Sequence, residues 1–158
     1  MQFIDEDTID QVAVRLGNSQ EAQAAAIEAL EEEQPVLLAF LFSENFEVFL
    51  SAEREYILFL VLVLIESIKK GTGQVLPMIS EEALGQAEEA NWERMQNISA
   101  KRFRERLDVF FEQTEQEDLL AFIEDALLDE EEGILSKEGR EPIFIILKSI
   151  IDALDKLQ

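Results

Sequence analysis

The chain has 158 residues, a formal net charge of −22, and neither cysteine nor histidine. The missing residue types exclude disulfides, thiolate nucleophiles, histidine bases and the usual zinc sites. The acidic balance argues against nucleic acids and anionic membranes as partners, because binding them needs clustered lysine and arginine.

Apolar residues make up 47% of the chain, whereas glycine (6) and proline (3) are scarce. This balance favours long helices joined by short turns around one core. The predicted fold is therefore all-α, a compact array of about seven to nine helices in a single domain, residues 1–158. Because no basic or apolar run opens the sequence, no signal peptide is predicted, and the expected location is the cytoplasm.

Three helices are predicted before residue 43, and each has a recognisable start. Acids open the first, Asn18 or Ser19 can cap the second, and Pro35 suits the first turn of the third. Apolar spacing or a high content of strong helix formers supports each of them. The predicted ranges are 5–16, 20–33 and 35–42, and a turn-rich segment follows at 43–50.

The segment 54–70 is the centre of the predicted fold, because its residues 56–65 are all apolar. Alternating β-branched residues within it would also suit a strand, but a strand usually has only about five to six residues. A membrane span is the other alternative, yet ten residues rise about 15 Å against a hydrocarbon core of about 30 Å. We therefore predict a helix that is apolar on all sides and enclosed by other elements.

The clearest break in the pattern is the uncharged, Gly- and Pro-containing segment 71–78. Helix caps are predicted at Ser51 for the central helix, at Ser80 after the break, and at Thr114, which makes a capping box with Glu117. The later helices are predicted at 80–97, 100–113, 119–128 and 142–157, with an exposed acidic turn at 129–132 before Gly133.

The two halves of the sequence resemble each other in order, which predicts a tandem duplication of residues 4–70 and 79–156. The matching segments are 4–7 with 79–82, 37–40 with 119–122, 50–51 with 135–136, and 54–55 with 140–141. Their separations of 75, 82, 85 and 86 residues only grow, and the insertions fall in predicted turns or helix ends. The alternative is chance similarity between helices drawn from the same few residue types.

A duplication would make the helices 54–70 and 141–157 equivalent and would pack them together near a pseudo-two-fold axis. Leu62 and Val63 in the first correspond to Lys148 and Ser149 in the second. The second central helix is therefore predicted to keep one face in water.

The strongest candidate for a functional site is the repeated Arg-Glu pair that begins each central helix. The pairs are Arg54 with Glu55 and Arg140 with Glu141. A carboxylate suits a helix N-terminus, whereas an arginine there is disfavoured by the helix dipole. Each arginine could bind a ligand carboxylate or phosphate, or could pair with an acid of the other half and fix the orientation of the repeats.

Other charged clusters are weaker candidates. Lys101, Arg102, Arg104 and Arg106 form the one basic cluster, which is expected to meet the chain's own acids. The acidic runs lie at helix ends and turns, and no EF-hand loop, Glu-x-x-His motif or phosphate-binding glycine loop is present. No metal, cofactor or catalytic residue is predicted.

These features favour a non-catalytic, acidic helical module for protein–protein interaction or an adaptor. The expected partner is a protein, for which a basic surface would suit the acidic chain, or a second copy of the chain, and neither nucleic acid nor a membrane is expected. One alternative is an enzyme that uses carboxylate and arginine chemistry in a groove between the halves. Another is an inhibitor, an immunity-type protein or a nucleic-acid mimic that binds a basic partner.

Overall fold

The computed structural model describes residues 1–129 and 135–157. The described residues form eight α-helices and two short 3-10 helices, with no strand, which confirms the predicted all-α fold. In chain order these elements are α1 (Glu6–Asn18), α2 (Gln20–Glu33), α3 (Pro35–Leu41), η1 (Glu44–Phe46), α4 (Ser51–Thr72), α5 (Glu81–Gln96), α6 (Phe103–Gln113), α7 (Glu117–Leu128), η2 (Lys137–Gly139) and α8 (Arg140–Leu157). The predicted turn at 129–132 and Gly133 lie, apart from Asp129, outside the described residues.

Most predicted helix starts are confirmed, and side-chain caps explain why. Asp5 precedes α1 and accepts a hydrogen bond from the Thr8 N–H at 2.8 Å. The Thr8 side chain, and next this N–H, lower the pKa of Asp5. The Ser19 and Ser80 hydroxyls accept equivalent bonds at the starts of α2 and α5. Each side chain satisfies one of the N–H groups that a helix start leaves unpaired.

Two predicted caps are wrong. Ser51 is the first residue of α4, and the Glu53 carboxylate instead accepts a hydrogen bond from the Leu50 N–H at 2.9 Å. Thr114 does not cap α7, because the helix begins two residues later than that cap requires, after Gln116. The Thr114 hydroxyl accepts the Gln116 N–H at 3.0 Å, and this turn leaves the Gln116 side chain available for the other half of the molecule.

Helix α4 is the enclosed helix that the sequence predicts. All residues from 60 to 65 are buried, and α1, α2 and α8 pack around it. Its last turn carries Lys69 and Lys70, and the chain leaves it through Gly73 in the left-handed conformation, with φ 67°. Such an ending suits both the helix dipole and the backbone geometry of a helix C-terminus. None of the described helices combines the length and apolarity that crossing a bilayer requires.

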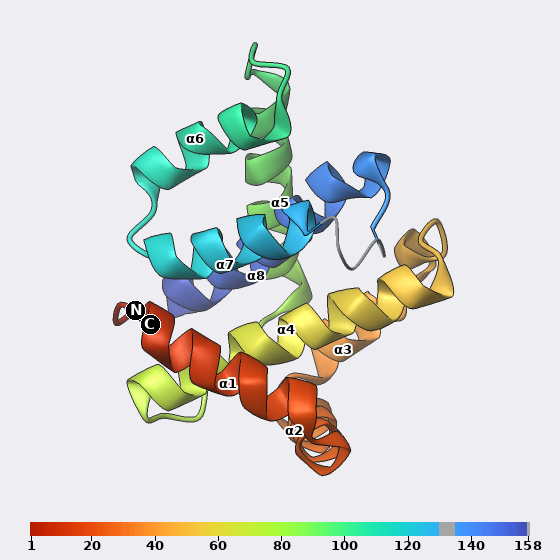
Figure 1. The fold of residues 1–158 in the computed structure, drawn as a ribbon, viewed down its shortest axis with the longest axis vertical. Helices are drawn as coiled ribbons and strands as arrows, with labels where there is room; N and C mark the ends of the chain where they lie inside the picture. Colours follow the sequence, from red (N-terminus) through yellow and green to blue (C-terminus); the bar gives the residue numbers. More distant parts are fainter. Residues whose placement is uncertain (130–134, 158) are drawn as a thin grey trace.

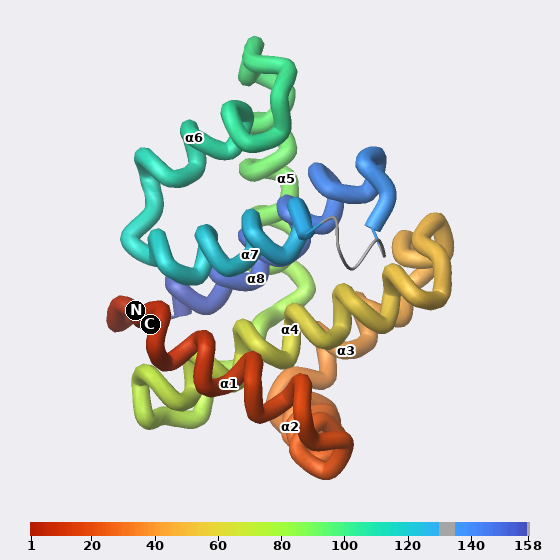
Figure 2. The backbone as a smooth tube through the Cα atoms, in the orientation of Figure 1, coloured from red at the N-terminus to blue at the C-terminus, as the bar shows by residue number. Residues whose placement is uncertain are grey.

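The two halves of the chain occupy different ends of the molecule, α1–α4 in the lower part of Figure 1 and α5–α8 in the upper part. In each half the first helix packs mainly on the fourth, α1 on α4 and α5 on α8. Helix α4 contacts α8, and α1 contacts α7, so the halves share one core. The backbone trace in Figure 2 follows the same division.

The prediction that α8 keeps one face in water is wrong. Lys148 is only 6% exposed and Ser149 is fully buried. The Asn91 side chain of α5 donates to the Ser149 hydroxyl at 3.1 Å and to Asp152 at 3.0 Å, and Lys148 is ion-paired with Asp152. Polar residues can lie inside this interface because they satisfy one another's hydrogen bonds.

Two buried glutamines link the halves in a reciprocal manner. Gln34, just before α3, accepts from the Ile79 N–H at 2.9 Å and donates to the Pro77 carbonyl at 2.8 Å. Gln116, just before α7, accepts from the Ile4 N–H at 3.1 Å and donates to the carbonyl of residue 2 at 2.9 Å. Each glutamine binds the segment that leads into the first helix of the opposite half, as a pseudo-two-fold arrangement requires. Common ancestry of the halves stays a prediction.

Candidate functional site

An open groove lies where the first half meets the second. It consists of two adjoining hollows of about 440 and 370 Å³, which share Phe40, Asn45 and Glu88. One wall is formed by α3 and the segment around η1, and the other by α5, with η2 and the start of α8 at one end. We call this feature the α3–α5 groove.

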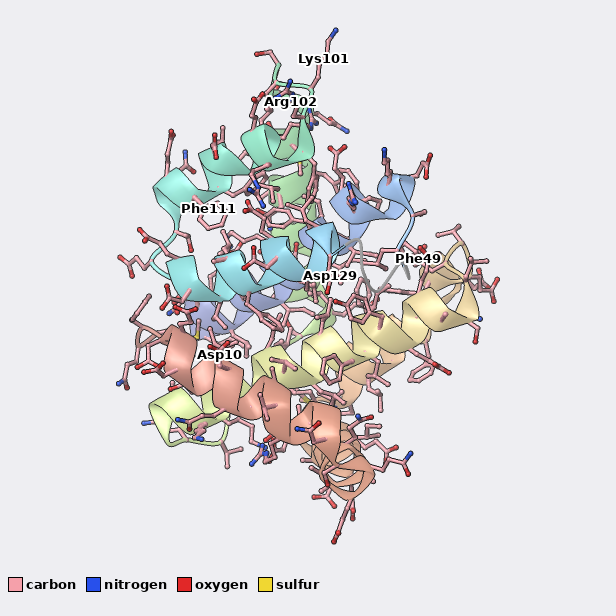
Figure 3. The ribbon with its side chains drawn as sticks, viewed as in Figure 1. Asp10, Phe49, Lys101, Arg102, Phe111 and Asp129 are labelled. Atoms are coloured by element: carbon pink, nitrogen blue, oxygen red, sulfur yellow. The ribbon has the colours of Figure 1, made fainter. Side chains whose placement is uncertain are left out.

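The floor of the α3–α5 groove is apolar and rich in aromatic side chains. Phe40 and Phe46 pack edge to face with ring centroids 5.2 Å apart, and Phe49 follows at 5.9 Å from Phe46. Phe49 lies where the first turn of α4 approaches η2 (Figure 3). Leu84 and Trp92 of α5 face these rings from the opposite wall. Such a surface suits an apolar anchor of a ligand.

Every ionisable side chain that lines the described part of the groove is an acid: Glu53, Glu81, Glu88 and Glu138. Glu88 differs from the others because it is half-buried and its side chain makes no hydrogen bond or ion pair within the described residues. Burial raises the pKa of Glu88. A partly desolvated carboxylate without a cation is unfavourable in the free protein and would gain from a cationic ligand.

The end of the groove at η2 is held in place by Glu53. Its carboxylate is buried at 4% exposure and accepts from the Ser136 N–H at 3.2 Å as well as from Leu50. A Cβ atom at Gly139 would lie 3.4 Å from the Glu53 carboxylate and 3.2 Å from the Ser136 hydroxyl. A side chain at this position would press on the Ser136 hydroxyl, and the hydrogen bond between Ser136 and Glu53 links the groove wall across the two halves.

The two halves meet along two lines, which we call seams: one lies between α3 and α5, and the other between α1 and α7. In the predicted repeat, the α1–α7 seam is the counterpart of the seam that holds the α3–α5 groove. Separations of 75 and 82 residues relate Leu84 to Ile9 and Phe40 to Phe122. The small hollow between α1 and α7 is lined by the counterparts of residues that line the α3–α5 groove: Glu6, Ile9, Asp10, Asp118, Ala121, Phe122 and Asp125. The two seams are thus equivalent positions in the predicted repeat.

The α1–α7 seam is nearly closed, whereas its counterpart is open. Its hollow is only about 140 Å³, and Asp118 accepts from the Glu6 N–H at 2.9 Å across it. Asp10, labelled in Figure 3, stands where the open groove has Gly85, and Ala13 stands where the groove has Glu88. The open groove therefore arises from a local difference between the halves and does not follow from the fold alone.

The two predicted Arg-Glu pairs make different contacts in the structure. Arg54 and Glu55 are exposed and line another hollow of about 360 Å³ beside α3 and η1. Arg140 donates to the Leu127 carbonyl at 3.1 Å, and Glu141 pairs with Arg106 at 2.9 Å. The partners of Arg140 and Glu141 lie in their own half, so within the described residues these bonds do not connect the repeats.

The hollow beside Arg54 carries mixed charge. Arg54 shares its rim with Glu47 and Glu55, above apolar residues that include Ile57. The Ser43 hydroxyl, which borders both this hollow and the α3–α5 groove, is buried without a hydrogen-bond partner in the described structure. Because both signs of charge are present, the hollow does not select a cationic or an anionic ligand.

The sequence pattern did not single out the groove residues. Glu88 belongs to an acidic pair, and Trp92 suits a core or rim position, so neither stands out locally. Gly85 was the available signal, because a glycine within a helix costs about 1 kcal/mol relative to alanine. Its counterpart Asp10 shows that the position does not require glycine for the fold.

No group of three or more acidic side chains in the described residues is arranged to hold a metal ion. Comparisons of the chain with protein-family models, with curated proteins and with solved structures give no match. The function has to follow from the residues of the site itself.

Proposed function

We propose that the protein is a non-catalytic interaction module that binds a basic protein segment in the α3–α5 groove. One observation carries the proposal: an aromatic floor is surrounded by lining acids, and the half-buried Glu88 has no cation within the described residues. An inhibitor or nucleic-acid mimic would be a special case, because it too requires a basic partner. A cytoplasmic location remains part of the proposal.

The chemistry favours a lysine or arginine next to an apolar side chain. The cation would pair with Glu88 in a partly dehydrated site, where charge-assisted hydrogen bonds are stronger than in water. Trp92 lines the same hollow, so a cation there also gains attraction from the aromatic face. The apolar neighbour would cover Phe40 and Phe46 and exclude water from the ion pair.

Trp92 provides a direct test, because it is the one tryptophan in the chain and lies in the groove. A synthetic peptide of alternating lysine and leucine should change the tryptophan fluorescence on titration, and a glutamate–leucine peptide should not. Glu88→Gln should weaken binding of the lysine peptide by about tenfold, whereas Glu89→Gln, an exposed neighbour outside the groove, should change it little. Equal effects of the two variants would contradict the proposal.

Gly85 allows the groove to be blocked without damage to the core. A Cβ atom added at Gly85 meets nothing within 4 Å, so the helix accepts a side chain there. Gly85→Leu should fill the hollow and abolish the fluorescence response, whereas Gly85→Ala should retain it. Retained binding by a folded Gly85→Leu variant would place the ligand elsewhere.

A further inference from the structure

We propose that the basic segment bound in the α3–α5 groove is residues 97–102 of a second copy of the chain, and that the protein forms a reciprocal two-fold dimer. The segment connects α5 to α6, and we call it the α5–α6 tip. This inference rests on the proposed function of the groove, because it names the partner for that same site.

The α5–α6 tip presents two cations that have no partner among the described residues. Lys101 and Arg102 are exposed, and their side chains make no hydrogen bond or ion pair within the described residues. They lie at the extremity of the molecule in Figure 3. The neighbouring cations are ion-paired within the molecule, Arg104 with Glu124 at 3.5 Å and Arg106 with Glu141 at 2.9 Å. The tip is thus a free basic segment in a strongly acidic protein.

The groove and the tip belong to the same side of one helix. Gly85, Glu88 and Trp92 are spaced three and four residues apart on α5, so they share a face. The same spacing reaches the exposed Gln96, the last residue of α5, and the tip begins directly after it. A partner that approaches this face of α5 therefore meets the groove and the tip together.

This arrangement lets two copies exchange tips. Glu88 and Gln96, where α5 ends and the tip begins, are eight residues apart, which corresponds to about 12 Å along the helix. Two antiparallel α5 helices, related by a two-fold axis between Trp92 and Gln96, would bring each tip beside the other copy's Glu88. Both contacts form in one event, as in an isologous dimer, so each strengthens the other.

The net charge of −22 opposes association, but it does not exclude a local contact. At about 0.15 M salt, charges more than about 8 Å apart are largely screened, while pairs in contact are screened less. Lower salt would strengthen the tip contact and the general repulsion at once. Salt dependence is therefore a poor test, and reversal of individual charges at constant salt is a better one.

The test uses the full chain at about 0.15 M salt, with molecular mass followed by sedimentation equilibrium over a range of concentrations. The unmodified chain should dimerise. Lys101→Glu/Arg102→Glu gives an acidic tip opposite an acidic groove and should weaken dimerisation by about tenfold or more. Glu88→Lys gives a cation opposite the basic tip and should weaken it similarly.

Mixing these two variants supplies the decisive result. The acidic tip of one variant then meets the cation introduced by Glu88→Lys, and the basic tip of the other meets an unchanged Glu88. A mixed dimer should therefore form where neither variant dimerises alone. Lys70→Glu/Lys156→Glu makes the same change in net charge as the tip variant, at two exposed lysines outside the groove and tip, and should still dimerise. Circular dichroism on every variant separates lost contacts from lost folding.

A chain that stays monomeric at all concentrations, or a mixture that forms no mixed dimer, overturns this inference. The proposed function is judged separately by the lysine–leucine peptide. If that peptide binds in a Glu88-dependent manner to a monomeric chain, the groove serves a basic segment of another protein and only the dimer is wrong. If the peptide does not bind either, both proposals fail.

Discussion

Gln34 and Gln116 stand 82 residues apart in the sequence, and each completes the backbone hydrogen bonds of the other's half. Both side chains are nearly inaccessible, with exposures of 1% and 3%. Both bind a donor and an acceptor on the segment before a first helix. The pair therefore joins the halves through hydrogen bonds that water cannot replace in the folded state.

Replacing either glutamine by leucine should destabilise the protein by about 2–4 kcal/mol, because it leaves a buried N–H and a carbonyl unpaired. Gln34→Leu and Gln116→Leu should have similar effects, since their bonds are equivalent. Urea unfolding measures the loss, and the exposed Gln20→Leu serves as control, with a change below about 0.5 kcal/mol. A loss near the control value for either buried glutamine would contradict this role.

The halves should depend on each other for folding. Separate chains of residues 1–74 and 75–158 each retain a segment whose glutamine partner lies on the other chain. Each also exposes a central helix that is covered partly by the opposite half. Neither chain alone should show the full helical circular dichroism, and an equimolar mixture should recover it. A fully folded single half would argue against the shared core.

Glu88 should lower the stability of the free protein at neutral pH. Burial raises its pKa above the usual 4.5, so the folded state holds the proton to higher pH than the unfolded state does. Stability therefore falls as pH rises through the folded pKa. Glu88→Gln should be more stable than the parent chain at about pH 7, and the difference should vanish in acid, below both pKa values.

Paired urea titrations at the two pH values measure this difference, with Glu89→Gln as the control. Residues of a binding site often lower the stability of the free protein because they are placed for the ligand. A Glu88→Gln variant that is less stable than its parent at neutral pH would mean that the carboxylate has a structural partner, and it would weaken the proposed binding role.

For the ion pair between Lys148 and Asp152, removing one charge should destabilise the protein more than removing both. Asp152→Ala leaves the nearly inaccessible Lys148 ammonium without its partner and should cost about 2–3 kcal/mol, somewhat less than for a fully buried pair because Asp152 keeps contact with water. The double variant Lys148→Met/Asp152→Ala removes both charges and should recover most of this loss in thermal unfolding. A double variant as unstable as Asp152→Ala would contradict the interpretation.

The helices were largely predictable because their signals are local. Ser19, Pro35 and Ser80 mark helix starts through their own hydrogen bonds or ring geometry, and ten adjacent apolar residues require an enclosed helix wherever it lies. The cap at Thr114 was mispredicted for a non-local reason. Gln116 begins the helix and its side chain is used by the other half, which no local pattern reports.

The site was harder to predict because its openness and its charge depend on residues that are distant in the sequence and meet only in the folded protein. Glu88 is unusual only because α3 lies opposite it without a cation. Lys148 is buried next to its ion-pair partner Asp152, which also accepts a hydrogen bond from Asn91 of the distant helix α5. Arg54 was selected by its repetition in the sequence. Its repeat partner Arg140 binds a carbonyl oxygen instead, so repetition alone did not identify a shared role.

The closed seam between α1 and α7 has a consequence for valency. Two identical chains around a two-fold axis would carry every surface feature twice, whereas a single polypeptide with two halves is free to alter one copy. Here Asp10 occupies the position that glycine leaves empty in the opposite seam. Among the described residues one seam consequently stays wide, and a small monovalent ligand of that groove is expected to bind with a stoichiometry of one to one.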